Sequence, residues 1–124
     1  MYYVNGNIQR EVLYKNGQLH GIAKTYYENK ILRSITTFKN NMSNGPYSHY
    51  YQNGCIMSVG ESINNKMSGE LTIYYPCSKK TPYNHGEIQY KINFKNGKAL
   101  SGVSFDKNRN KSIMTHAHLN VMGF

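Results

Sequence analysis

Tryptophan is absent from this 124-residue sequence, and acidic side chains are scarce, with 6 Asp and Glu against 15 Lys and Arg. The few carboxylates form no obvious acid–base pair and no nucleophile motif is present, so the sequence argues against an enzyme. His116 and His118 have no Cys, Asp or Glu nearby in sequence to complete four ligands, so neither a metal site nor another cofactor is predicted.

Long apolar runs are also missing from the chain. No stretch approaches the roughly 20 apolar residues that a membrane-spanning helix needs. No apolar signal-peptide core follows a basic start either. We therefore expect a cytoplasmic protein if Met1 is the native start, and a surface or secreted protein if an export signal precedes this sequence.

Tyrosine is abundant instead, with 12 Tyr beside 4 Phe. A tyrosine ring covers apolar surface while its hydroxyl stays in water, which suits a thin sheet better than a thick core. The formal net charge of +9 favours an acidic partner, such as nucleic acid, anionic lipid or an acidic protein face.

Pairs of adjacent tyrosines recur every 24 residues, at Tyr2-Tyr3, Tyr26-Tyr27, Tyr50-Tyr51 and Tyr74-Tyr75. After the pair come a turn, an alternating run and a second turn. The second turns are Lys15-Asn16-Gly17, Lys39-Asn40-Asn41, Asn64-Asn65-Lys66 and Lys95-Asn96-Gly97. Asn-Gly between alternating runs is a strong hairpin signal, because type I′ turns need positive φ at both central residues. Each copy is therefore predicted to be a β-hairpin.

Successive hairpins predict an all-β fold, an antiparallel meander of tandem β-hairpin repeats in an extended, twisted, single-layer sheet. The whole chain, 1–124, is expected to form one domain with copies at about 2–25, 26–49, 50–73 and 74–105. The fourth copy carries an insertion at 76–85, and 106–124 holds a degenerate copy and a capping strand. That strand is predicted over Ile113–Val121, where apolar and polar residues alternate.

Superposing the copies indicates which face of the sheet is buried. Side chains two residues apart on a strand share a face. The face that begins at the always apolar position of Ile8, Leu32, Ile56 and Ile88 is the better candidate for burial. The other face carries polar residues but also Leu13, Ile35 and Val59, so neither face is cleanly polar.

The two rings of each tyrosine pair are expected to point to opposite faces of the sheet. Tyr26, Tyr50 and Tyr74 are expected to line one face, and Tyr27, Tyr51 and Tyr75 the other. At least one of these ladders is expected to serve repeat packing, while the other is open to a partner. Arg10, Lys24 and Arg33 lie near the ladders and complete the predicted binding residues. Nucleic acid is disfavoured as the partner because no nucleic-acid fingerprint accompanies them.

The string Tyr-Tyr-x-Asn-Gly, an alternating strand, Tyr/Phe-Lys-Asn-Gly and then Leu-x-Gly resembles the bacterial variant of the MORN (membrane occupation and recognition nexus) repeat. Residues 2–75 carry the motif well and 86–110 carry it moderately. The resemblance implies hairpin repeats in an extended sheet and a non-catalytic role as an interaction or scaffold module. Bacterial proteins with this variant are often labelled antitoxins, and eukaryotic relatives are linked to membrane phospholipids.

The sequence therefore leaves four classes of binding partner to be distinguished. Another protein is the leading expectation, and a cognate toxin is an alternative. An anionic membrane is a third, because lysines stand at the predicted hairpin tips, at Lys15, Lys30, Lys39, Lys79, Lys80, Lys95 and Lys98. Self-association is a fourth, through the sheet edge at the N-terminal end.

Cys55 and Cys77 are placed by the repeat in turns of successive hairpins on the same rim. Such turns lie two strand spacings apart, about 9–10 Å. A disulfide needs Cα atoms within roughly 7 Å. Two free thiols are therefore predicted.

Overall fold

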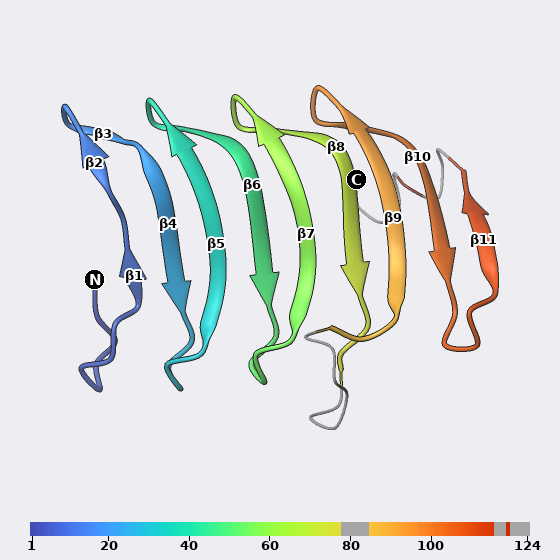
Figure 1. Ribbon diagram of the computed structural model, residues 1–124, viewed down its shortest axis with the longest axis horizontal. Coiled ribbons are helices and arrows are strands. Elements are labelled where there is room, and N and C mark those ends of the chain that lie inside the picture. Colours follow the sequence, from blue (N-terminus) through green and yellow to red (C-terminus); the bar gives the residue numbers. More distant parts are fainter. Residues whose placement is uncertain (78–84, 116–118, 120–124) are drawn as a thin grey trace.

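The structure, a computed structural model, describes residues 1–77, 85–115 and 119, in which the strands form one broad, curved sheet (Figure 1). The strands of this part of the chain are β1 (Arg10–Glu11), β2 (Tyr14–Lys15), β3 (Gln18–Leu19), β4 (Gly21–Tyr26), β5 (Leu32–Lys39), β6 (Met42–Tyr50), β7 (Ile56–Ile63), β8 (Lys66–Tyr74), β9 (Ile88–Lys95), β10 (Lys98–Phe105) and β11 (Lys111–Met114).

Nine of these strands form a single antiparallel sheet in the order β1-β4-β5-β6-β7-β8-β9-β10-β11. The two short strands β2 and β3 pair with each other as a separate ribbon within the first hairpin. The sheet runs from β1 at one edge to β11 at the other without closing (Figure 1). The predicted all-β meander of tandem hairpins is therefore confirmed.

The hairpin turns along one rim have the backbone that the Asn-Gly pattern predicts. The first central residue has φ near +50° in each copy, at Asn16 (52°), Asn40 (51°), Asn64 (49°) and Asn96 (51°). The second central residue is again left-handed, at Gly17 (77°), Asn41 (67°), Asn65 (67°) and Gly97 (81°). Positive φ at both positions matches the right-handed twist of the flanking strands. Each turn therefore reverses the chain so that the strand after it pairs with the strand before it.

Three of these turns also connect neighbouring hairpins; in the last of them the N–H of Gly97 donates to the carbonyl of Met67 at 3.0 Å. The N–H of Asn41 donates to the carbonyl of Leu19 at 3.0 Å, and its side-chain Oδ1 accepts from the Leu19 N–H at 2.7 Å. Asn65 makes the same pair of bonds with Ser43, at 2.9 and 2.6 Å. Asparagine in place of glycine therefore keeps the turn and adds a side-chain bond to the preceding copy.

The second tyrosine of each pair ties its copy to the next copy along the sheet. The hydroxyl of Tyr3 donates to the carbonyl of Tyr26 at 2.6 Å, and Tyr27 bonds to Tyr50 at the same distance. Tyr51 donates to the carbonyl of Tyr74 at 2.7 Å, and Tyr75 donates to that of Phe105 at 2.8 Å. We call these four bonds the tyrosine clasps.

On the opposite rim the turns also repeat. The N–H of Tyr3, Tyr27 or Tyr51 donates to the carbonyl four residues on, and Asp106 makes the same bond to Asn110. In the fourth copy the N–H of Tyr75 donates to the carbonyl of Glu87 at 2.8 Å. The usual turn bond therefore spans the insertion, and β9 starts in register.

The core lies under the C-terminal half of the sheet. Leu71, Ile92, Phe94, Met114 and Leu119 form a buried cluster, with Ile92 at 0% and Leu119 at 1% exposure. A Cβ built on Gly102 would lie 3.3 Å from the Leu119 side chain and 3.2 Å from that of Ile92. A side chain at position 102 would therefore require Ile92 or Leu119 to shift by a few tenths of an ångström.

The predicted terminal strand is shorter than expected. It pairs with β10 but ends at Met114, and the N–H of Leu119 donates to the carbonyl of Thr115 at 3.0 Å. A bond between residues four apart does not occur within an extended strand, so the predicted strand does not run through Leu119. Positions 116–118 and 120–124 of that prediction lie outside the described residues.

The face predicted for burial is the buried one only beyond the first position of each later strand. Leu32, Ile56 and Ile88 pair with Tyr26, Tyr50 and Tyr74 next to a register shift, so a bulge places these three apolar residues on the other face. Ser34, Ser62, Ile92 and Phe94 are all buried at the predicted positions. The first copy differs, because Ile8 is 41% and Tyr14 65% exposed. The first copy has no preceding hairpin beside it in this structure, so these side chains lack the neighbours that their counterparts have.

Candidate interaction surface

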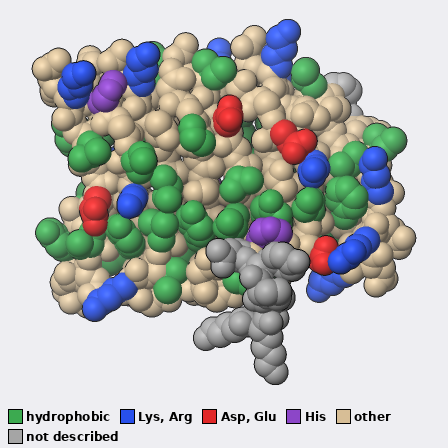
Figure 2. Space-filling view, in the orientation of Figure 1, with side chains coloured by type: hydrophobic (Ala, Val, Ile, Leu, Met, Phe, Trp, Pro, Cys, Tyr) green, Lys and Arg blue, Asp and Glu red, His purple; other side chains and the backbone are tan. Residues whose placement is uncertain are grey.

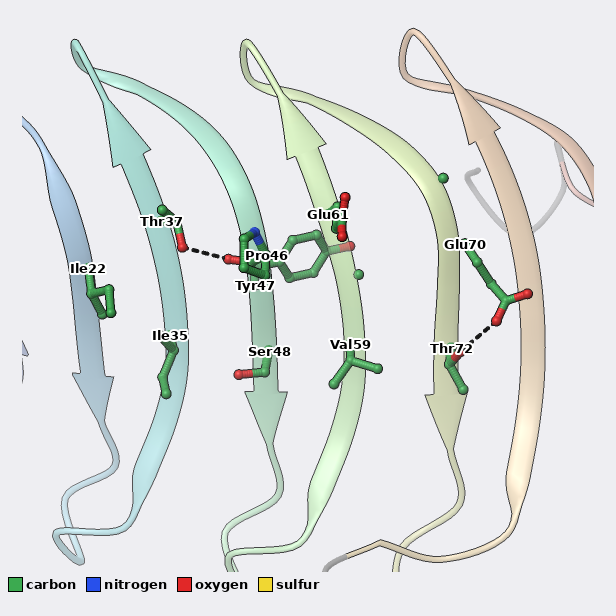
Figure 3. Close-up of a pocket in the computed structure, with 12 residues that line it drawn as sticks. Ile22, Ile35, Thr37, Pro46, Tyr47, Ser48, Val59, Glu61, Glu70 and Thr72 are labelled. Atoms are coloured by element: carbon green, nitrogen blue, oxygen red, sulfur yellow. Dashed lines mark hydrogen bonds between the residues drawn. The ribbon is translucent and has the colours of Figure 1, made fainter.

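A shallow groove of about 670 Å³ crosses the other face of the sheet from β4 to β8 (Figure 3). Its apolar walls come from Ile22 on β4, Ile35 on β5 and Val59 on β7. Hydroxyl and carboxylate side chains also line it, at Thr37, Ser48, Glu61, Glu70 and Thr72. Figure 2, drawn from the same side, shows apolar side chains gathered in a band across this face.

Strand register explains why these residues meet. Ile35 pairs with Ser48, Ser48 with Val59, and Val59 with Thr72, so the four side chains form a row across neighbouring strands. Paired residues of adjacent antiparallel strands point to the same side of the sheet. The signal for this row in the sequence was the apolar Ile35 and Val59 on a face that is otherwise mostly polar.

The first tyrosine of each pair belongs to the groove face. Tyr26, Tyr50 and Tyr74 stand an even number of residues after Ile22, Ser48 and Thr72 on β4, β6 and β8, so strand alternation places them on the same side. All three are partly buried. This ladder lies on the groove face outside the groove lining, and its rings add apolar surface to that face.

Each ring of this ladder has its own surroundings. The Tyr50 hydroxyl accepts a bond from Ser48 Oγ at 3.2 Å. Burial raises the pKa of the Tyr26 hydroxyl, and the nearby Glu11 carboxylate raises it further. His85 stacks on Tyr74 with 4.4 Å between ring centroids. Tyr26 and Tyr50 are therefore the ladder members whose rings no other aromatic ring covers among the described residues.

The second tyrosines have a structural task. The hydroxyls of Tyr27, Tyr51 and Tyr75 make the clasps, and burial raises the pKa of Tyr51. The Arg33 guanidinium also lies over the Tyr27 ring, 5.6 Å from its centroid. Of the two predicted ladders, this one holds the repeats together.

The three predicted basic residues do not converge on one surface. Lys24 stands between Ile22 and Tyr26 on β4 and so points to the groove face. Arg10 pairs with Thr25, whose side chain points to the opposite face, and Arg33 lies over Tyr27. The predicted set of six tyrosines and three basic residues is therefore divided between the two faces.

The charges along the groove are mostly acidic, although the whole chain is basic. Glu61 and Glu70 line the groove, and Lys91 forms an ion pair with Glu70 at 3.7 Å. Figure 3 shows both carboxylates on the groove side of β7 and β8. The net charge of +9 therefore does not describe the surface that this face offers to a partner.

The prediction of two free thiols is wrong, because Cys55 and Cys77 form a disulfide with their Cα atoms 6.1 Å apart. The prediction assumed that Cys77 occupies a turn equivalent to that of Cys55. After Tyr75 the chain instead enters the insertion and passes close to the previous turn, where Asn53 Nδ2 donates to the Cys77 carbonyl at 3.1 Å. This path brings the two Cα atoms within disulfide reach.

The lysines at hairpin tips lie along two rims. Five exposed lysines lie at or beside the Asn-containing turns of one rim, namely Lys15, Lys39, Lys66, Lys95 and Lys98. Lys30 lies on the opposite rim, and Lys79 and Lys80 lie outside the described residues.

The described residues contain neither a metal-binding cluster nor a membrane-spanning helix. No three His, Cys, Asp or Glu side chains there are grouped so as to hold a metal ion; His116 and His118 lie outside this part. No helix in it has the length and apolar character needed to cross a membrane.

The protein is therefore an open sheet of tandem hairpins. The second tyrosines bond neighbouring repeats to each other, and the groove face is exposed. Comparison with protein families gives a match to the MORN repeat variant at residues 1–16 and 19–40, which cover most of the first two copies. The first two copies therefore match the repeat variant that the tyrosine motif predicted. No curated protein matches it significantly.

Proposed function

We propose that this protein is a non-catalytic interaction module that binds another protein through the groove face of its sheet. The observation that carries the proposal is that the two tyrosine ladders have different surroundings. The second tyrosines are bonded into the clasps, whereas Tyr26 and Tyr50 stand beside an open, partly apolar groove. Partly apolar concave surfaces with a few polar groups are common binding sites.

The family match supports the same class of function. MORN repeats generally serve as interaction modules for proteins or membranes, and the two matched segments build the end of the sheet where the groove begins. A cognate toxin is one form that the protein partner could take. The neighbouring genes distinguish this alternative, since a small toxin-like neighbour favours it and a secretion or surface locus does not.

The test compares two matched substitutions in affinity capture from the native lysate. Ile22→Arg places a charge in the groove, and Leu100→Arg places it on a similarly exposed side chain of β10, outside the groove; the native residues are 49% and 50% exposed. We expect the first variant to lose the captured partner and the second to keep it. Equal loss or equal retention in both variants would contradict the proposal.

A second candidate function is peripheral binding to an anionic membrane through the lysine rim. The observation that favours it is the row of five exposed lysines. Each lysine near an anionic surface contributes about 1 kcal/mol of binding free energy. Co-sedimentation with phosphatidylserine vesicles tests it. Binding should fall when Lys39 and Lys66 are changed to glutamine, and an equal affinity for neutral vesicles would exclude it.

The disulfide bears on where the protein works. Disulfides persist in oxidising compartments and are rare in the cytosol. Of the two expected locations we therefore propose the surface or secreted one, supported by the Cys55–Cys77 bond. Fractionation of source cells with thiol alkylation tests this, because an alkylated, cytosolic protein would contradict it.

A further inference from the structure

We infer that the segment received by the groove is apolar and carries a cationic side chain that pairs with Glu61. This inference rests on the proposed function and names the chemistry of the partner at the same surface. It runs against the acidic partner that the net charge of the chain favours.

Glu61 is the carboxylate of the groove lining that has no ion-pair partner among the described residues. Within the described part of the chain the ion pairs are Lys91 with Glu70 and Arg109 with Glu87, so Glu61 takes part in none. Lys24 on the same face stands in register with Glu11 on the neighbouring strand. Of the two carboxylates that line the groove, Glu61 is therefore the one without an ion-pair partner in the described chain.

The neighbours of Glu61 make a partner cation favourable there. Val59 precedes it by two residues on the same face of β7, and Pro46 is its register partner on β6. Apolar walls reduce the water around a bound cation, which strengthens its attraction to the carboxylate. Arginine fits better than lysine, because its planar group bonds to both carboxylate oxygens.

The apolar walls also indicate that the cation belongs to a protein segment. Ile22 is 49% exposed, and Ile35 and Val59 are partly exposed on the same surface. A small free cation leaves these walls in water, whereas a segment with apolar residues beside its arginine covers them. Charge and apolar surface together therefore specify an apolar, singly basic segment.

The test uses dye-labelled synthetic peptides of alternating valine and threonine with one central arginine, and measures binding by fluorescence anisotropy. Matched peptides carry citrulline or glutamate in place of arginine. We expect the arginine peptide to bind on the order of tenfold more tightly than the citrulline peptide. The preference should disappear in Glu61→Gln and persist in Glu28→Gln, which makes the same charge change at an exposed turn outside the groove.

Three results would overturn the inference: no binding of the arginine peptide, an equal or better affinity for the citrulline or glutamate peptide, or a preference that survives Glu61→Gln. The proposed function fails separately. If partner capture depends on Ile22 but not on Glu61, the groove binds a protein and only the cationic chemistry is wrong. If capture is independent of Ile22, the groove is not the binding surface.

Discussion

At the scale of single residues, the structure shows how the repeat tolerates substitutions at its turns. Gly6 and Gly54 adopt φ of 86° and 92°, and the equivalent residue of the second copy is Lys30, with φ of 73°. A side chain in the left-handed region costs energy that glycine does not. The turn still forms, because the N–H of Lys30 bonds to the Tyr27 carbonyl at 3.0 Å. The backbone pattern of the repeat therefore overrides the local preference of lysine.

Lys30→Gly should raise the free energy of unfolding by about 1 kcal/mol, because it removes the left-handed strain at this turn. Urea denaturation followed by circular dichroism measures the change. Lys30→Ala is the control, since it removes the charge and keeps the strain. A gain in Lys30→Ala equal to that in Lys30→Gly would attribute the effect to charge.

Protonation of His49 should destabilise the fold. Burial lowers the pKa of His49 below its ordinary 6.5, and Arg33 lowers it further. The unfolded chain then binds the proton more readily than the folded one, so this stability is present above about pH 6.5 and is lost as the pH falls through the folded pKa.

Denaturation curves between about pH 7 and pH 5 test this expectation. The free energy of unfolding should fall with pH less steeply in His49→Gln than in the native protein. Parallel curves for the two proteins would mean that His49 does not contribute to the pH dependence.

At the scale of elements, the contacts between hairpins are as regular as the hairpins themselves. Each clasp joins a tyrosine hydroxyl to the carbonyl at the end of the strand that precedes the next turn, and Asn41 and Asn65 connect the hairpins at the opposite rim. In the fifth copy Asp106 stands where the second tyrosine would be. Because an ionised carboxylate donates no hydrogen bond, the series of clasps ends at β10.

Tyr51→Phe should lower the free energy of unfolding by about 1 kcal/mol, because it leaves the Tyr74 carbonyl without its hydroxyl donor. Thermal and urea denaturation measure the loss. Tyr14→Phe is the matched control, because Tyr14 is 65% exposed and lies outside the clasps. Equal stability of the two variants would show that the clasps do not hold the copies together.

The sequence predicted the elements where local chemistry determines them and missed what depends on distant segments. Turn residues such as Asn16 and Gly17 require positive φ, so hairpins and their period could be predicted from spacing alone. The disulfide could not, because the path from Tyr75 to Cys77 departs from the repeat. The groove was indicated only by Ile35 and Val59, since the clasps that distinguish the two tyrosine ladders depend on three-dimensional register.

At the scale of the whole molecule, the two halves of the sheet are stabilised differently. The buried cluster lies under the later strands. Among the described residues, seven of the eleven exposed large apolar residues fall within the first 22 positions, namely Met1, Tyr2, Val4, Ile8, Leu13, Tyr14 and Ile22. The first hairpin borders an open sheet edge at β1. The N-terminal copy is therefore expected to open more readily than the rest of the sheet.

Removing the disulfide by Cys55→Ser with Cys77→Ser should lower the free energy of unfolding by about 3 kcal/mol, the value typical of a closed loop of this size. The sequence separation of the two cysteines is 22. Denaturation without reductant measures the loss. In excess reductant the stability of the native protein should approach that of the variant. Alkylation of both native cysteines without reductant would contradict the bond itself.

The central claim is that the groove face is the surface that meets the partner, and site-specific photocrosslinking tests it most directly. A benzophenone side chain is placed at Ile35 in the groove, or at Leu100, which is 50% exposed and outside it. We predict that illumination in the native lysate yields a defined protein adduct from position 35 and none from position 100. An adduct from position 100 without one from position 35 would contradict the claim.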